Sequence, residues 1–237
     1  IKVFIMLVFV VGAFAATAQN KSEKQPEFIA IQHASFVMRQ GGLTIFVDPT
    51  GKAEQYTPYG TPDLILITHE HSDHFDKQLI NSLKAESTLL VAPTVITSAL
   101  GFGHVMNNNE TFVYKKVKIE AIPMYNTTPD RLKYHKKGVG NGYVLTINGK
   151  RTYIAGDTED IPEMLVLKNI DHAFVCMNLP YTMSVEQAAR AVLALQPKNV
   201  YPYHYRTQGV DPNETIATFK ALVAADAKIN VVMLKWY

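Results

Sequence analysis

An apolar run that leads directly into a histidine-rich turn constrains this chain more than any other feature. Residues 64–68 read Leu-Ile-Leu-Ile-Thr, which predicts a strand buried on both faces. Residues 69–76 follow as His-Glu-His-Ser-Asp-His-Phe-Asp, and we expect a helix over 75–84. Since α/β sheets bind ligands at the carboxyl ends of such strands, we predict an α/β fold with a site at this edge.

The remaining strands and helices have ordinary local signals. Gly41-Gly42 and Asn148-Gly149 predict hairpin turns, and Ser184 with Gln187 forms a capping box. We expect further strands over 28–31, 35–38, 43–47, 88–92, 111–114, 117–122, 143–147, 151–155, 171–177, 199–203 and 230–234. We expect further helices over 94–100, 185–195 and 212–225. Strands first, then strands alternating with helices, indicate two sheets covered by helices.

The turn after the strand carries four metal-binding side chains within six residues, namely His69, His71, Asp73 and His74. Imidazole and carboxylate suit zinc, iron or manganese. A spacing of two lets His69 and His71 point the same way along an extended turn, which leaves Asp73 and His74 free to face a second metal. The alternative is a solvated polar loop, and the density of ligand types favours the metal site.

This H-x-H-x-D-H pattern resembles the signature of the metallo-β-lactamase superfamily. Gly156-Asp157-Thr158 and Pro202-Tyr203-His204-Tyr205 are similar to two later motifs of that family. The openings Gln32-His33-Ala34-Ser35-Phe36 and Asp48-Pro49 also resemble it, so the similarity extends over 28–236. The nearest branch contains ascorbate-6-phosphate lactonase-like proteins and N-acyl-phosphatidylethanolamine-hydrolysing phospholipase D. The resemblance implies a four-layer αβ/βα sandwich with the metals at one sheet edge.

The resemblance also implies a ligand set for two metals, with one departure from the family. Asp157 would bridge both ions, and Asp73 and Asp157 are the candidate catalytic carboxylates. The family's third histidine for the first metal is missing, because Asn126 stands near its place. We predict that His135 on the same loop replaces it; Asn126, or a weak first site, is the alternative. The predicted metal ligands are His69, His71, Asp73, His74, His135, Asp157 and His204.

Two ions sharing a carboxylate would hold a water between them and generate a hydroxide that attacks a carbonyl or phosphorus centre. We therefore predict a metal-dependent hydrolase, with two Zn²⁺ and with Mn²⁺ or Fe as alternatives, acting on an ester, lactone or phosphodiester. Competing hypotheses are an iron-dependent redox enzyme on the same fold and a non-catalytic binding protein. The diiron oxygen reductases of this fold need an acid where His71 stands.

The other polar residues have weaker signals. His33 and Asp48 could support the metal ligands or simply pack, and Cys176 is expected in the core. Tyr181, Tyr203 and Tyr205 could line a pocket or pack. The loop over 123–142 carries several cations, which predict either a solvated face or attraction of an anionic small-molecule substrate. These cations are Arg131, Lys133, Lys136 and Lys137.

The first 18 residues differ from the rest. An apolar run ending in Ala16-Thr17-Ala18 predicts a cleaved signal peptide over 1–18, a polar linker over 19–27 and a hydrolase domain over 28–237. We therefore expect an exported protein, periplasmic or secreted, with no stable membrane anchor after cleavage. The net charge of +2 argues against nucleic-acid binding, and the single cysteine excludes an intrachain disulfide. Oligomeric state is not predicted.

Overall fold

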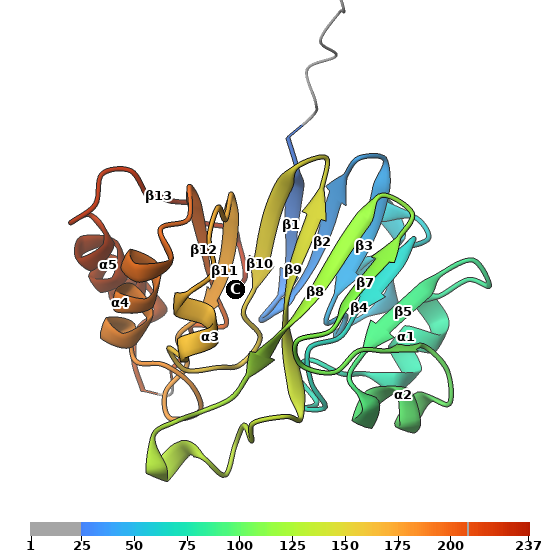
Figure 1. Ribbon diagram of the computed structural model, residues 1–237, viewed down its shortest axis with the longest axis horizontal. Coiled ribbons are helices and arrows are strands. Elements are labelled where there is room, and N and C mark those ends of the chain that lie inside the picture. The colour runs from blue at the N-terminus through green and yellow to red at the C-terminus, as the bar shows by residue number, and fades with distance from the viewer. Residues whose placement is uncertain (1–24, 208) are drawn as a thin grey trace, which may run out of the picture.

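The computed structural model describes residues 25–207 and 209–237, which form two packed β-sheets with helices outside (Figure 1). The mixed α/β architecture with two sheets confirms the predicted fold class. The predicted signal peptide and most of the linker lie outside the described residues. Within the described part of the chain, no helix has the length and apolar character needed to cross a membrane.

The first sheet has six strands in the order β1-β2-β3-β4-β5-β6. The β1-β2-β3 segment is antiparallel, and β4, β5 and β6 continue in parallel. Parallel neighbours need crossover connections, which α1 (Lys77–Leu83) and α2 (Thr94–Leu100) provide. The strands are β1 (Glu27–Gln32), β2 (Ser35–Gln40), β3 (Leu43–Val47), β4 (Leu64–Leu66), β5 (Leu89–Ala92) and β6 (His104–Val105).

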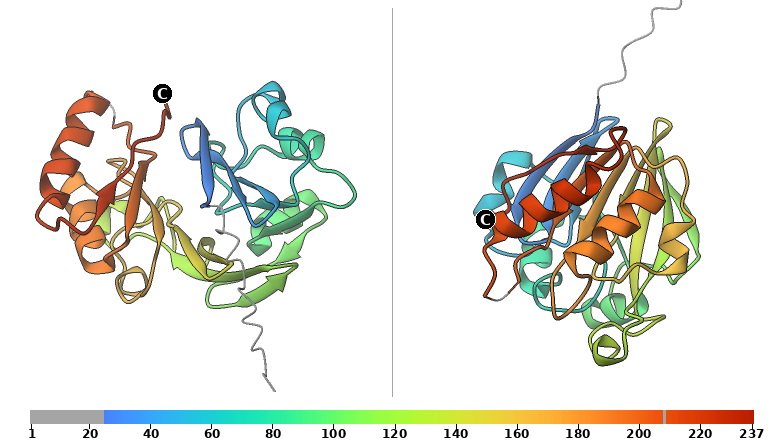
Figure 2. Two further views of the ribbon diagram at one scale, coloured as in Figure 1. Left: turned by 90° about the horizontal axis from the view of Figure 1, so that it is seen from above. Right: turned by 90° about the vertical axis from the view of Figure 1, so that its left-hand side faces the viewer.

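The second sheet has seven strands in the order β13-β12-β11-β10-β9-β8-β7. The strands are β7 (Thr111–Tyr114), β8 (Val117–Met124), β9 (Gly140–Ile147), β10 (Lys150–Ile154), β11 (His172–Cys176), β12 (Asn199–Tyr203) and β13 (Asn230–Val231). The helices α3 (Pro162–Leu165), α4 (Val185–Leu195) and α5 (Pro212–Val223) belong to this half. Figure 2 shows α4 and α5 outside the second sheet and α1 and α2 outside the first, so the layers run helix, sheet, sheet, helix.

Side-chain alternation along β2 explains how the first sheet is buried on both faces. Phe36 and Met38 belong to the large core that includes the second sheet, whereas Val37 packs with α1 and α2. Successive residues of a strand point to opposite faces, so both faces of β2 must be apolar. The same reasoning holds for β4, where Leu64 and Ile65 belong to different cores.

Two predicted elements differ from the structure. The strand expected over 230–234 stops at Val231 as β13, and residues 232–234 pack partly buried against the main core. Five short elements of the described residues lacked a sequence signal: β6, α3 and the 3₁₀ helices η1 (Ala53–Gln55), η2 (Thr57–Tyr59) and η3 (Pro129–Arg131). The long loop is shorter than expected, because β8 and β9 extend into it and leave residues 125–139, including η3 (Pro129–Arg131).

Candidate metal centre

The histidine-rich turn connects β4 to α1 and folds tightly on itself. The carbonyl of His71 accepts hydrogen bonds from the backbone N–H of His74 at 2.9 Å and of Phe75 at 2.8 Å. The helix then begins where the side chain of Asp76 accepts a bond from the N–H of Leu79 at 2.9 Å, the usual N-cap arrangement. The turn therefore presents its histidines at the carboxyl edge of the first sheet.

The first cluster contains His69, His71 and His135, whose donor nitrogens all lie within 4.8 Å of one another. Nδ1 of His71 lies 3.2 Å from Nε2 of His135. The loop over 125–139 carries His135 to this place, and the backbone N–H of Asn126 bonds the carbonyl of His135 at 3.0 Å. Three imidazoles at this separation match the donor set of a zinc site.

A second group contains Asp73, His204 and His33, and a third contains His69, His74 and Asp157; within each group the donor atoms lie within 4.8 Å of one another. Nε2 of His204 lies 3.3 Å from Oδ2 of Asp73 and 3.4 Å from Oδ2 of Asp157. Asp157 Oδ1 lies 3.4 Å from Nε2 of His74, and its Oδ2 lies 3.5 Å from Nε2 of His135. One carboxylate between two imidazole clusters has the arrangement of a bridging metal ligand.

Among the described residues, four buried atoms of the predicted ligands have no hydrogen-bond partner: Nε2 of His69, His74 and His204, and Oδ1 of Asp157. Most buried polar atoms in proteins are paired, so four unpaired atoms around one space need an explanation. Bound cations would pair with them, and imidazole nitrogen with carboxylate oxygen is a donor set that zinc accepts. The residues therefore fit the metals that the sequence predicts.

Asp48 fixes the orientation of two of these histidines. Its Oδ2 accepts hydrogen bonds from Nδ1 of His74 at 2.8 Å and from the hydroxyl of Thr68 at 2.7 Å. The Thr68 hydroxyl in turn lies 2.9 Å from Nδ1 of His69. Because the Nδ1 atoms carry the protons, the Nε2 atoms of His69 and His74 are left bare for a metal. Asp48, fully buried, thus supports the ligands rather than merely packing.

The Nδ1 atoms of His135 and His204 also have polar neighbours. Nδ1 of His135 lies 3.2 Å from the backbone carbonyl of Tyr181. The side-chain amide of Asn178 lies 3.0 Å from Nδ1 of His204. The Tyr181 carbonyl is an acceptor of the kind that orients metal-binding imidazoles, whereas the Asn178 amide nitrogen donates to Nδ1 of His204. Nε2 of His135 and of His204 lie 3.5 Å and 3.4 Å from Oδ2 of Asp157, so both face the centre.

The charges of the centre favour a cation. Burial alone would raise the pKa of Asp157, but His204 and His74 outweigh it and hold this pKa well below its usual value. Burial lowers the pKa of His69 well below its usual value and also lowers that of His135. Burial would lower the pKa of His74 too, but Asp157 and Asp48 raise it well above the usual value. Asp157 and Asp48 therefore favour positive charge in this space, which a bound cation would supply.

The side-chain nitrogen of Asn126 donates to the carbonyls of Arg131 at 3.0 Å and Tyr181 at 2.7 Å, so this amide braces the loop that presents His135. Its Oδ1 is buried without a hydrogen-bond partner among the described residues, so Asn126 stays the alternative ligand. The structure brings the seven predicted ligands together with His135 in the first cluster. Their assignment as ligands stays a prediction.

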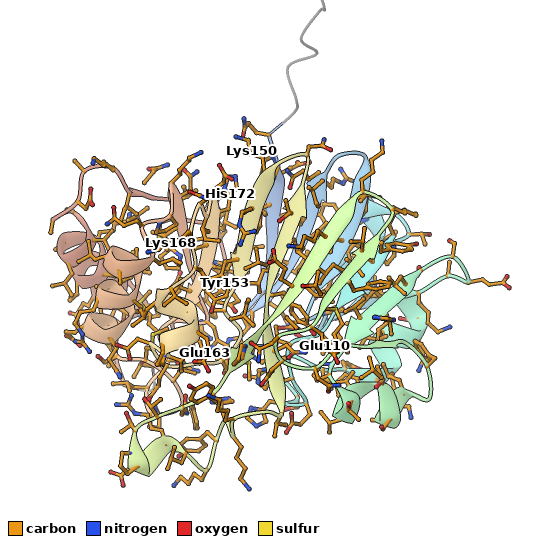
Figure 3. All side chains as sticks on the ribbon, viewed as in Figure 1. Glu110, Lys150, Tyr153, Glu163, Lys168 and His172 are labelled. Carbon is orange, nitrogen blue, oxygen red and sulfur yellow. The ribbon has the colours of Figure 1, made fainter. Side chains whose placement is uncertain are left out.

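Two of the four cations on the loop, Arg131 and Lys137, form ion pairs. Arg131 donates to Glu159 at 2.6 Å and to Gln187 at 2.8 Å, and Lys137 donates to Glu163 at 2.8 Å. Figure 3 labels Glu163, which belongs to α3. Arg131 and Lys137 thus fasten the loop to the second half of the molecule.

Other residues singled out in the sequence lie in the core or away from the centre. Burial raises the pKa of the Cys176 thiol to about 12, so this cysteine is a core residue. The Tyr203 hydroxyl is buried and accepts the N–H of Gly156 at 2.8 Å. The ring of His172 packs at a tilt against Phe28 with ring centroids 5.2 Å apart, and Figure 3 shows His172 toward the opposite end of the strands.

A cavity of about 750 Å³ opens over the centre. His71, Asp73, His135, Asp157 and His204 line it from the metal-binding side. No sequence motif predicts the rest of the wall, because its residues come from separate loops. They are Ser72, Tyr134, Asn178 and Arg206, together with His33 and Tyr181, whose roles had been left open.

Comparison with known proteins agrees with this geometry. The model of the beta-lactamase superfamily domain matches residues 28–204. A UPF0173 metal-dependent hydrolase of Pyrococcus abyssi is 31% identical over 218 residues, which cover 84% of this chain and 93% of the relative.

Two solved structures are similar over most of the chain. A protein of Parabacteroides distasonis described as a metal-dependent hydrolase is 41% identical with a TM-score of 0.78, and the match covers 89% of this chain and 99% of that one. A metallo hydrolase of Ignicoccus hospitalis is 25% identical with a TM-score of 0.74, covering 89% and 95%.

Proposed function

The chain belongs to the beta-lactamase superfamily and is a metal-dependent hydrolase, and from that premise we propose a two-zinc enzyme for small anionic esters, lactones or phosphodiesters. The observation that carries the proposal is the set of unpaired buried atoms on His69, His74, Asp157 and His204 beneath an open cavity. Cavities of this size hold small molecules.

Some of the predicted ligands are buried beneath the cavity, and others border it. His69 and His74 are buried at the floor, whereas His71, Asp73 and His204 border the cavity. This arrangement leaves the cavity side open, as in catalytic rather than structural zinc sites. When bound, the two ions would lower the pKa of a shared water and stabilise negative charge on the leaving oxygen.

The position and charge of Arg206 support the proposal that the substrate is anionic. Its guanidinium carbon lies 4.2 Å from the ring centroid of Tyr237, and the side chain borders the cavity. Among the described residues no carboxylate forms an ion pair with it. Apart from Asp73 and Asp157, which are predicted metal ligands, the lining residues carry no negative charge. A stacked, unneutralised guanidinium binds carboxylate or phosphate in a fixed orientation.

The first test removes one ligand at a time. We expect His71→Ala and Asp157→Ala to abolish hydrolysis of activated esters, lactones and bis-aryl phosphodiesters while circular dichroism stays unchanged, with His104→Ala as the control. His104 stacks on Phe112 at 3.8 Å and is remote from the ligands. Turnover in both ligand variants would refute the mechanism, and iron instead of zinc in the purified protein would favour the redox alternative.

The second test addresses charge. Arg206→Gln should raise KM for an anionic ester by about 10-fold or more, the equivalent of one lost charged hydrogen bond, and leave KM for its neutral analogue unchanged. Arg190→Gln is the control, because Arg190 is exposed on α4. Equal effects on both substrates would exclude a role in anion binding. We also propose export, on the basis of the A-x-A pattern in residues 16–18.

A further inference from the structure

His33 and His204 occupy unusual backbone conformations next to each other. Their φ angles are +54° and +47°, a region that side chains other than glycine seldom adopt. The carbonyl of His33 accepts the N–H of His204 at 3.3 Å, and the two rings lie 3.9 Å apart between centroids. Strained residues of this kind concentrate at functional sites.

The ring of His33 connects a predicted metal ligand to the end of the chain. Its Nε2 lies 3.1 Å from Oδ2 of Asp73, and its Nδ1 lies 3.2 Å from the hydroxyl of Tyr237. A carboxylate only accepts hydrogen bonds, so Nε2 carries the proton and Nδ1 accepts from Tyr237. The result is a directed chain from Tyr237 through His33 to Asp73.

The segment over 232–237, which we call the C-terminal strap, holds Tyr237 in this position. Trp236 is buried, and its ring contacts Phe36 of the first sheet and Phe174 and Tyr203 of the second. The strap therefore lies between the two sheets and is anchored one residue before Tyr237. In Figure 2 the carboxyl end lies at the opening between the two sheets.

We propose that His33 is a positioning residue for the second metal site, acting through Asp73, and that the C-terminal strap tunes the affinity of that site through Tyr237. The Nε2–H of His33 fixes one oxygen of the half-exposed Asp73 carboxylate, and the Tyr237 hydroxyl fixes the tautomer of His33. Partners of a ligand typically change metal affinity by about 10–100-fold. The inference depends on the two-ion centre of the proposed function but not on turnover.

The test measures zinc affinity by competition with a chromophoric chelator and zinc content by mass spectrometry. We expect His33→Ala to weaken the second ion by about 10-fold or more and leave the first unchanged. His33→Gln places an amide N–H near Nε2, so it should restore most of the affinity. Tyr237→Phe should weaken the second ion by about 3–10-fold, as one hydrogen bond does. His104→Ala is the control.

Two results would overturn the proposal. Equal loss in His33→Gln and His33→Ala would make His33 a direct ligand, because an amide nitrogen does not replace imidazole on zinc. Unchanged affinity in His33→Ala would make it a packing residue. If His33→Ala does not fold, Tyr237→Phe and His33→Gln decide the question. A wild-type protein that binds two ions without hydrolysing any substrate would refute the proposed function alone.

Discussion

Replacing Asp48 by Asn should weaken both the fold and the metal centre. Asparagine tolerates the left-handed backbone of this position, where φ is +43°, so the change acts through the side chain. The carboxylate accepts the N–H of Thr68 on one oxygen, and the Thr68 hydroxyl and Nδ1 of His74 on the other. If the amide oxygen of the new asparagine still accepts the N–H of Thr68, its amide nitrogen faces two donors, the Thr68 hydroxyl and Nδ1 of His74.

The size of the loss in stability follows from the two hydrogen bonds to Oδ2 of Asp48, from the Thr68 hydroxyl and from Nδ1 of His74. A hydrogen bond to a charged group contributes about 1.5–3 kcal/mol. The Thr68 hydroxyl can rotate and accept from the amide, so the net loss is that of the bond to His74. We expect Asp48→Asn to lower the free energy of unfolding of the metal-free protein by about 2–3 kcal/mol, and zinc affinity by about 10–100-fold, because His69 and His74 lose their orientation.

Urea unfolding followed by circular dichroism measures the first quantity, and chelator competition measures the second. Asp63→Asn is the matched control, because Asp63 accepts the N–H of Thr44 and pairs with exposed Lys115 away from the metals. That surface pair contributes about 1 kcal/mol or less, and zinc affinity should not change. If the two variants behave alike, Asp48 does not orient the histidines.

Local sequence signals located the site because its central ligands lie on one turn. The apolar strand before His69 fixes where the turn begins, and the H-x-H-x-D-H spacing indicates which of its side chains can share a metal. The boundaries of α2 and α4 were predicted residue for residue, since both have clear ends. Residues 232–234 lie beyond the end of β13, although the N–H of Val232 still bonds the carbonyl of Val200 at 2.8 Å. Their apolar character indicates burial and does not show where regular strand pairing ends.

Contacts between distant segments could not be predicted in the same way. Arg131 and Lys137 look like free cations along the chain, and only the packed fold brings Glu159 and Glu163 against them. His33 lies 204 positions from Tyr237. Nothing in the sequence indicates that a histidine and a tyrosine so far apart in the chain are in contact. The ligand supports therefore depend on the packing of the two sheets, which local patterns do not describe.

Two further predictions concern the loop that carries His135. His135→Ala should reduce bound zinc from about two ions to one per chain, whereas Asn126→Ala should keep both and lower stability by about 1–3 kcal/mol; metal analysis that finds the reverse would reassign the ligand. Glu159→Gln should destabilise the protein by about 2–3 kcal/mol at neutral pH, because the carboxylate accepts bonds from Thr127, Thr128 and Arg131. Burial would raise the pKa of Glu159, but the bonds from Thr127 and Thr128 lower it overall. A carboxyl group whose pKa is lower in the folded than in the unfolded protein stabilises the fold at pH values above its unfolded-state pKa of about 4.3. The difference in the free energy of unfolding between wild type and Glu159→Gln should thus be largest at neutral pH. It should disappear as the pH falls through the folded-state pKa of Glu159. Urea unfolding at several pH values measures it, and a difference that persists in acid would show that the carboxylate charge is not responsible.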